Sequence, residues 1–582
     1  MPRVARDRAI ALRDDDYELG TYTRAISTTS PEAQRWFNRG LAWTFAFNHE
    51  AGIRCFEVVL ELDPQCALAH WGIAFCNGVN YNNSSQFTQP GKFPSLNDAS
   101  EHGRKALALL EHASAVEQML VEAIVARCDI DAMPNSCQER RKLNSEFAAN
   151  MAKVYEAYPD DPDIAALYGE SLMNIYPWHL WVNGKVREPD ALFAGTAVIL
   201  DVLRSGLSKA PSHPGLLHMY IHAMEMAPAP QVCLPETNRL RNLAKDAGHL
   251  LHMPSHIDVL VGNYEDAIVA NTRAIEADRK YISRNGAGNF YMLYCCHDCH
   301  MMVYSAMMAG DQRRATEAAN ELRTWLLKKE VEALMKHKMA DMLESFVSMH
   351  MHVKVRFGQW KEILNEPLPT DEGLYCTTLA VTRYARVLAF AALCDVENAT
   401  VELRAFKKAY DKVPETRTTF SMVCRDVLAV ASAMADGEVS YRRGDHQLAF
   451  TQLREAVVLD DGMPYNEPWG WMQPARHALG ALLLEQGHAE QAIKVYRTDL
   501  EIGHHPRNIW ALHGLEECLQ KSPSLAAHDG ELKETQELLE RARQCCDVSV
   551  TASCFCRLSV CGDKHMGVGR EERKSAVKIT DA

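Results

Sequence analysis

Residues 31–64 read PEAQRWFNRGLAWTFAFNHEAGIRCFEVVLELDP, and this stretch predicts a pair of packed helices. Apolar residues recur at every third or fourth position in both halves, which is typical of amphipathic helices. The residues that stand at the spacing of a repeating helical hairpin are Trp36, Gly40, Trp43, Gly52, Phe56 and Pro64. The glycines let the two helices approach closely, and the aromatic rings fill the groove toward the next hairpin. The stretch therefore predicts a hairpin that packs against further copies.

This spacing resembles the 34-residue tetratricopeptide repeat (TPR), and looser copies follow along the chain. One copy carries Gly437 and Ala449, and the next carries Gly480 and Ala492. Ala449 and Ala492 lie 43 positions apart, which predicts an insertion of about nine residues at 465–473. The resemblance implies an all-α fold, a TPR-like α-solenoid in which helical hairpins form a superhelix around a central concave cleft.

The pattern divides the chain into four parts. We expect an N-terminal extension at 1–30 and a solenoid at 31–521 whose centre, 213–300, is rich in histidine. A linker, a C-terminal helix and a cysteine-containing cap follow at 522–567, and a disordered tail at 568–582. Residues 81–100 are rich in turn formers and predict a long loop inside the solenoid.

Composition narrows the classes of function. The 582 residues carry a net charge of −14, which argues against nucleic acid or an anionic membrane as the main partner. There is no apolar run long enough for a membrane span and no signal-peptide pattern at the N-terminus. We therefore expect a cytoplasmic protein in which most of the 18 cysteines are small buried apolar residues.

Histidines are concentrated in one region. Eight of the 24 lie within residues 213–300. His218 and His222 are four residues apart on a predicted helix, as are His252 and His256, so each pair projects from one helical face. His297 begins the helix of the following hairpin. Histidines that neighbouring helices present in this way are suited to binding a transition metal.

The predicted metal ligands are His218, His222, His252, His256 and His297. The predicted metal is copper, zinc or iron, because neutral imidazole binds all three. His249 and His300 are left outside this set, and His213 is expected in a loop. The predicted catalytic residues are Glu225, Glu467 and Arg476: either glutamate as an acid or base, and the arginine as a partner for a carboxylate or phosphate.

The central segment also resembles a particular family. The stretch AGHLLHMPSHIDVLVGNYEDAIVANTRAIEADRKYI and the helix LLHMYIHAMEM upstream are similar to segments of a family of large TPR proteins, mainly of bacterial type, with an HMPSHI-like motif. The third cluster, YCCHDCH, departs from the family pattern at Asp298 and Cys299. The resemblance covers about residues 31–556; it implies a TPR fold and no particular reaction.

Two functions follow from these patterns. The first is a metal-binding TPR protein that acts as an enzyme, a hydrolase or an oxidoreductase, on a small molecule in the concave face. The alternative is a non-catalytic scaffold that binds a partner peptide or protein, the usual role of such arrays. The 465–473 insertion is then either a wall of the site or a loop packed over the groove. Cys554 and Cys556, with Cys561, form either a soft-metal site or a packed cap.

Overall fold

The computed structural model describes residues 16–83, 95–128, 136–502, 504–522 and 528–557. Nearly all of its regular structure is helical, as the sequence predicts, and its consecutive helices pack as TPR-like hairpins. The chain forms two compact units, residues 1–260 with 266–298 and residues 261–265 with 299–582. Each unit is described by itself. Among the described residues, no helix is both long and apolar enough to span a lipid bilayer.

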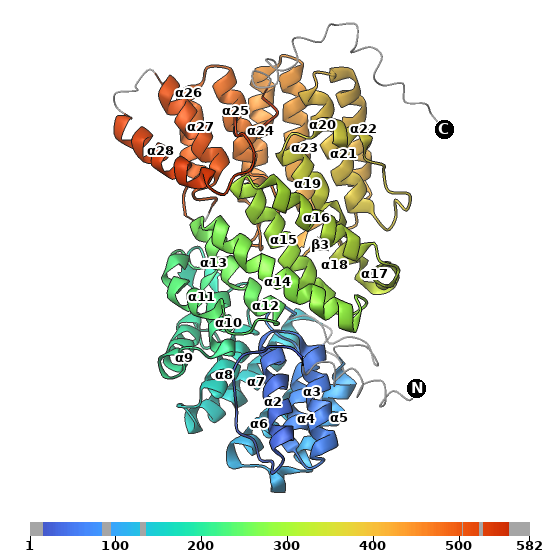
Figure 1. Cartoon of the computed structure of the whole chain (residues 1–582), viewed down its shortest axis with the longest axis vertical. Coiled ribbons are helices and arrows are strands. Elements are labelled where there is room, and N and C mark those ends of the chain that lie inside the picture. The colour runs from blue at the N-terminus through green and yellow to red at the C-terminus, as the bar shows by residue number, and fades with distance from the viewer. Residues whose placement is uncertain (1–15, 84–94, 129–135, 503, 523–527, 558–582) are drawn as a thin grey trace. The chain divides into compact units, whose positions relative to one another are not determined.

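The elements that make up the first unit or cross its boundary follow in chain order (Figure 1). They are α2 (Pro31–Phe45), α3 (His49–Leu62), α4 (Ala67–Cys76), α5 (Leu96–Leu107), η1 (Leu110–His112), α6 (Ala115–Cys128), α7 (Cys137–Ala157), α8 (Pro162–Met173), β1 (Trp181–Val182), β2 (Lys185–Val186), α9 (Thr196–Lys209), α10 (Pro214–Met224), η2 (Pro230–Cys233), α11 (Leu234–Leu240), α12 (Gly248–His252), α13 (Pro254–Val261), α14 (Tyr264–Asn285) and α15 (Met292–Ala309).

The second unit continues the series. Its elements are α16 (Gln312–Leu326), α17 (Lys329–Leu334), η3 (Met335–Met339), α18 (Ala340–Leu343), η4 (Glu344–Ser348), α19 (Met349–Arg356), α20 (Trp360–Asn365), α21 (Cys376–Ala392), α22 (Val396–Asp411), β3 (Thr418–Thr419), β4 (Met422–Val423), α23 (Cys424–Arg442), α24 (His446–Asp461), α25 (Ala475–Glu485), α26 (Ala489–Asp499), α27 (Ile509–Lys521) and α28 (Asp529–Arg543).

The first hairpin, α2 and α3, packs as the repeat spacing predicts. The Ser30 hydroxyl accepts a hydrogen bond from the Ala33 amide and caps α2, with Pro31 in the first turn. A Cβ atom on Gly40 of α2 would lie 2.5 Å from the Phe56 ring, and one on Gly72 of α4 would lie 2.6 Å from it. Phe56 is thus clamped between glycines of two successive hairpins, so a side chain at either glycine would force the helices apart.

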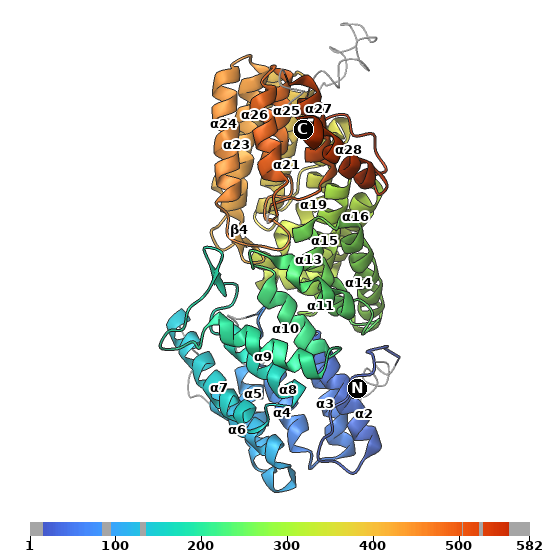
Figure 2. The ribbon, with the colours of Figure 1, turned by 90° about the vertical axis from the view of Figure 1, so that its left-hand side faces the viewer.

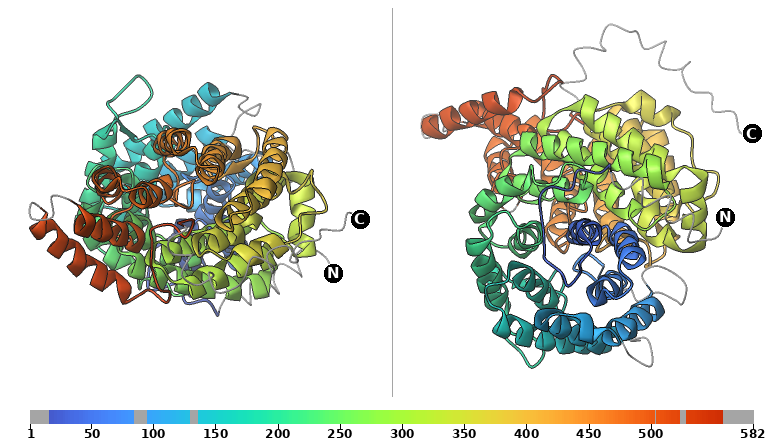
Figure 3. Two further views of the ribbon diagram at one scale, coloured as in Figure 1. Left: turned by 90° about the horizontal axis from the view of Figure 1, so that it is seen from above. Right: turned by 60° about the horizontal axis from the view of Figure 1, so that its bottom comes forward.

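Successive helices of the first unit pack against one another, and the later ones return to the first. Helices α3 to α9 contact their neighbours in order, and α10 packs against α8, α9 and also α2. Figure 3 shows these helices following one another in a curved row. Residues before α2 belong to this packing as well, since Tyr17 is buried against the rings of Trp43 and Tyr281. The end of α2 therefore lies beside α10, which carries the first histidine pair.

The second unit repeats the hairpin plan (Figure 2). Helices α23, α24, α25 and α26 pack in sequence, and Gly480 of α25 meets the Tyr496 ring of α26 just as Gly40 meets Phe56. The predicted insertion lies between α24 and α25, where residues 462–474 are not helical. The predicted 81–100 loop is shorter than expected, because Ser95 caps α5 and the helix begins at Leu96. The predicted tail at 568–582 lies outside the described residues.

Candidate metal centre

Six histidines meet in the first unit, presented by four short helical segments. His218 and His222 lie on α10, His249 and His252 on α12, His256 on α13 and His297 on α15. All six are buried, with at most 4% of any residue exposed. All five predicted ligands belong to this set, and His249, which the prediction left out, completes it.

A break in the helix places the two middle histidines. Helix α12 ends at His252, and Pro254 opens α13, where its missing N–H removes no helical hydrogen bond. The Ser255 hydroxyl donates to the His252 carbonyl oxygen at 2.7 Å and holds the turn together. His252 and His256 thereby face each other across the break. The HMPSHI sequence is thus a helix break that turns two imidazoles toward one another.

The first triad consists of His218, His222 and His249, whose ligand nitrogens lie within 4.8 Å of one another. The His218 Nδ1 donates to the Phe45 carbonyl oxygen at 2.6 Å, and the His222 Nδ1 donates to Glu225 at 3.1 Å. The remaining Nε2 atoms of both rings, and both ring nitrogens of His249, are buried without a hydrogen-bond partner. Buried nitrogens in this state are costly unless something binds them.

The second triad consists of His252, His256 and His297 and is equally compact. The His252 Nδ1 donates to the Asn271 Oδ1 at 2.7 Å, and the amide of Asn271 donates to the Ala267 carbonyl, which fixes its orientation. The His256 Nδ1 donates to a Glu225 oxygen at 2.8 Å. Both histidines therefore keep their hydrogen on Nδ1 and carry a lone pair on Nε2.

These lone pairs point at one another. The Nε2 atoms of His252 and His256 are 2.7 Å apart, and that of His256 is 3.2 Å from the Nε2 of His297. Two imidazole lone pairs at this distance repel unless a proton or a cation lies between them. Metal-bound histidines show the same arrangement, in which the second ring nitrogen donates to a carboxylate, carbonyl or amide oxygen.

Glu225 joins the two triads. As the residue that ends α10, it accepts hydrogen bonds from His222 of the first triad and His256 of the second. Its side chain is fully buried. A carboxylate with two imidazole donors orients the rings and raises their basicity. Its contacts are therefore those of a residue that positions ligands, whereas the sequence predicts a catalytic acid or base.

Burial sets the protonation of these rings. Removal from water lowers the pKa of His218 to about 3, and burial followed by mutual repulsion among the rings lowers the pKa of His222 and His249 well below the usual value. Burial also holds the pKa of His252 low. These four rings are therefore neutral near pH 7, which is the form that binds metal.

An acidic group lies at the edge of the centre. Asp298 has a carboxylate oxygen within 4.8 Å of ligand nitrogens of both His249 and His252. Burial, and next the neighbouring Asp278, raise the pKa of Asp298 well above its usual range. A protonated acid becomes a carboxylate when a cation comes near, so Asp298 can compensate added positive charge. The sequence marked this residue only as a departure from a family pattern.

Aromatic rings enclose the first triad. The Phe47 ring centroid lies 4.4 Å from that of His218, and the Tyr81 ring lies 5.1 Å from that of His222. Tyr294 meets His249 edge-on at 4.9 Å, and Trp178 meets His222 in the same way at 5.8 Å. The turn at Tyr81 thus faces the first triad. These rings exclude bulk water, which strengthens electrostatic interactions within the centre.

The remaining histidines of the region have other roles. His213 is the N-cap of α10, where its Nδ1 accepts the Leu216 amide and its Nε2 lies 2.9 Å from Asp163. His300 belongs to the second unit, where its Nε2 contacts the Met472 sulfur at 3.0 Å. Both residues lie outside the group of six histidines, and both were left out of the predicted ligand set.

Glu467 and Arg476, the other predicted catalytic residues, lie in the second unit. The Tyr465 hydroxyl donates a hydrogen bond to the Glu467 carboxylate at 2.6 Å. The peptide bond between Glu467 and Pro468 is cis. Arg476 forms two hydrogen bonds of 2.5 Å to Asp461 at the end of α24. Its guanidinium is therefore already engaged by a carboxylate of its own chain.

Comparisons with known proteins give no family match and only distant structural likenesses. No protein-family model matches the chain, and no curated protein matches it. Among solved structures, a human IFIT1 dimer with m7Gppp-AAAA is similar over 92% of this chain and 93% of its own, at 11% identity and a TM-score of 0.31. Yeast Tom70 is similar over 88% of this chain and 89% of its own, at 10% identity and a TM-score of 0.25. The APC/C hetero-tetramer Cut9–Hcn1 is similar over 88% of this chain and 96% of its own, at 13% identity and a TM-score of 0.23. With scores this low, none of these likenesses bears on function.

Proposed function

We propose that the chain is a metalloprotein in which each triad binds one transition-metal ion. The observation that carries this proposal is the pair of His252 and His256 Nε2 atoms, which face each other 2.7 Å apart in a buried site. A cation removes the repulsion between them, and the unpartnered nitrogens of the first triad gain a partner in the same way. Copper, zinc and iron all suit such a set of imidazoles.

The arrangement supports an enzyme that acts on a small molecule. Three protein ligands leave a coordination position open for water or a substrate, as in catalytic metal sites. A bound zinc ion would supply hydrolytic chemistry and copper or iron would supply redox chemistry. In either case Glu225 keeps the rings oriented, Asp298 is the nearby group able to hold or release a proton, and the aromatic rings exclude bulk water. Glu467 and Arg476 remain predicted catalytic residues.

The alternative, a scaffold for a partner peptide or protein, rests on the helical array. In that case the six histidines would be packing or hydrogen-bonding residues. The facing Nε2 atoms of His252 and His256 speak against this role, because a packed histidine gains nothing from a ring nitrogen placed 2.7 Å from another. The chain could bind a metal at the histidines and a protein at another surface of the helical array. The two functions therefore differ only in the role that they assign to the histidines.

Two finer proposals accompany this function. We propose that the chain belongs to the TPR family with HMPSHI-like motifs, since the residues of that motif build the helix break at the heart of the second triad. We also propose a reducing, cytoplasmic compartment, supported by the fifteen described cysteines that form no disulfide, most of them buried.

Metal analysis tests the proposal. The full chain, expressed with added copper, zinc or iron in turn and freed of loosely bound ions, should retain about two ions of one metal per chain. Exhaustive chelation should lower its thermal stability, because an ion that binds only the folded state stabilises it. Less than about 0.2 ions per chain under every supplementation, with stability unchanged by chelators, would refute it.

A further inference from the structure

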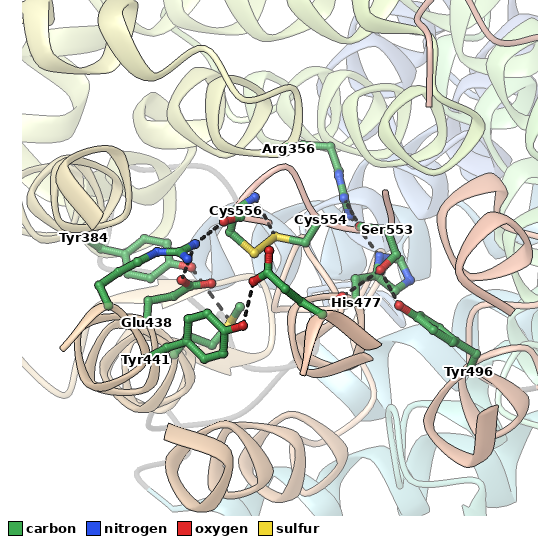
Figure 4. Close-up of a disulfide and its surroundings, with 12 residues drawn as sticks. Arg356, Tyr384, Glu438, Tyr441, His477, Tyr496, Ser553, Cys554 and Cys556 are labelled. Atoms are coloured by element: carbon green, nitrogen blue, oxygen red, sulfur yellow. Dashed lines mark hydrogen bonds and ion pairs between the residues drawn. A yellow bond between two sulfur atoms is a disulfide. The ribbon is translucent and has the colours of Figure 1, made fainter. Parts of the chain in front are cut away.

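A second reactive group lies in the second unit, where Cys554 and Cys556 form a disulfide (Figure 4). The sequence suggested a metal site or a packed cap here. The two residues belong to a segment, 551–557, that follows α28 without regular structure. Cys556 is 3% exposed, whereas Cys554 is partly exposed. Cys561, the third cysteine considered, lies outside the described residues.

The position of the bond argues against a structural crosslink. A disulfide stabilises a fold chiefly by closing a loop of the unfolded chain, and the effect grows with the length of that loop. The loop between Cys554 and Cys556 contains a single residue. Two cysteines placed this closely therefore add little stability by being joined.

The segment is held in place without the disulfide. Arg356 of α19 donates to the Ser553 carbonyl oxygen, and Arg442 of α23 donates to the Cys556 carbonyl oxygen. The Ser553 hydroxyl donates to the His477 carbonyl oxygen at 2.8 Å. These contacts involve the backbone and Ser553, so they persist whether the sulfurs are bonded or not. The fold thus accommodates both oxidation states of the pair.

The surroundings treat the two sulfurs differently. The Cys556 amide donates to the Cys554 sulfur at 3.4 Å, an interaction that favours a thiolate there. Glu438 of α23, which is buried, has a carboxylate oxygen within 4.8 Å of both sulfurs. Burial raises the pKa of Glu438 and of the Cys556 thiol, whereas the contact with Cys556 lowers the pKa of the Cys554 thiol. Cys554 has the properties of an attacking thiol and Cys556 those of a resolving one.

We propose that Cys554 and Cys556 form a redox-active dithiol–disulfide pair that exchanges with low-molecular-weight thiols and disulfides. Both sulfurs line a small cavity of ≈ 20 Å³, about the space of one water molecule, together with Arg356, Glu438 and His477. Of the two residues, Cys554 is the more exposed. This activity is independent of the metal centre, which lies in the other unit.

The exchange balances in two steps. A thiolate attacks the Cys554 sulfur and forms a mixed disulfide; the original S–S bond breaks, and its electron pair leaves on Cys556, which takes a proton with Glu438 beside it. In the second step, another thiol molecule attacks the small-molecule sulfur of the mixed disulfide. The bond to Cys554 breaks, and Cys554 leaves as a thiolate. Two thiols are oxidised to one disulfide while the pair is reduced, and oxidation of the pair is the reverse.

Glutathione is the probe for the test. The full chain is equilibrated with reduced and oxidised glutathione at a series of ratios, quenched with acid, alkylated and analysed by mass. The oxidised fraction of the pair should fall from above about nine-tenths to below about one-tenth over a roughly hundredfold rise in the square of the reduced glutathione concentration divided by the oxidised glutathione concentration. Cys556→Ser should trap glutathione on Cys554, and Cys554→Ser should trap several-fold less on Cys556.

Cys545→Ser is the matched control, because Cys545 is a partly buried cysteine of the same region and forms no disulfide. It should leave the titration unchanged. A pair that stays thiol, or stays disulfide, at every ratio would overturn the proposal. So would stoichiometric binding of Zn²⁺ or Cu⁺ by the reduced chain that is lost in Cys554→Ser and blocks the exchange, because the pair would then be a metal site.

Discussion

The two units each bury a group of histidines, and the groups differ in what their nitrogens meet. In the second unit His477 donates to Asp499 at 2.8 Å, and His505 donates to the same carboxylate at 2.9 Å. The other nitrogen of His477 accepts from Arg356 at 2.9 Å, and Asn508 also donates to Asp499. Each of these contacts pairs a donor with an acceptor, so the network is complete in itself. In the first unit the Nε2 atoms face one another or have no partner.

This difference separates a structural histidine from a candidate ligand. Burial and clustering are common to both units, so neither indicates a metal. The distinguishing feature is the gathering of ring nitrogens into two triads, while Nδ1 of four of the six histidines donates to an oxygen: His218, His222, His252 and His256. The second unit thus supplies matched controls for the first.

The largest expected effect is the loss of both ions. The double variant His218→Ala/His252→Ala removes one ligand from each triad and should reduce bound metal from about two ions per chain to near zero. Metal content is measured by mass spectrometry on protein whose circular dichroism shows retained helix. A helical double variant that still carries about two ions would show that the triads do not hold the metal.

His477→Ala tests the hydrogen-bonded histidine network of the second unit. Removing this ring leaves Asp499 and Arg356 short of a buried partner, which should cost about 3–5 kcal/mol of unfolding free energy. Denaturant titration measures the cost. The metal content should stay at the wild-type value, because the complete network binds no ion. A fall in bound metal with the fold intact would contradict the distinction between the two units.

Glu225→Gln tests whether the carboxylate orients the ligands. The neutral amide cannot accept both imidazole donors as the carboxylate does, so metal affinity should fall by about 10- to 100-fold while the ligands themselves remain. Competition with a chelator of known affinity measures the change. Glu344→Gln is the control, since that buried glutamate of the second unit accepts the backbone amides of Thr377 and Thr378. Equal loss of affinity in both variants would remove Glu225 from the site.

The smallest effect is a pH dependence in the second unit. Burial lowers the pKa of folded His477 to about 4, whereas the unfolded ring titrates near its usual 6.5. Between these values the unfolded chain binds the extra proton, so stability falls as the pH drops from about 6.5 to 4, by at most about 1.4 kcal/mol per pH unit from this ring. His477→Gln should flatten that slope, measured by denaturant titration at several pH values. An unchanged slope would show that the ring does not titrate as inferred.

Much of the fold could be predicted because the hairpin spacing is local. Gly40 and Phe56 lie 16 residues apart, and their contact follows from the repeat alone. The histidine pairs at four-residue spacing are local as well, and Pro254 indicates where the helix restarts. These features placed five of the six histidines now found together.

The rest of the centre depends on contacts between distant parts of the chain. His249 was left out because it stands outside the pair of His252 and His256, and its contact with His218, 4.9 Å between ring centroids, joins α12 to α10. Phe47 reaches the first triad only because α10 packs back on α2. Glu225 was predicted as an acid or base, but its second partner, His256, lies 31 positions further on. No local pattern carries such information.

Anomalous diffraction at the absorption edge of the bound metal tests the central claim most directly. The account predicts two peaks in the first unit, one among the Nε2 atoms of His252, His256 and His297 and one among the nitrogens of His218, His222 and His249, each about 2.0–2.1 Å from its ligands. An intact centre with no peak in either triad, in crystals of metal-supplemented protein, would contradict it.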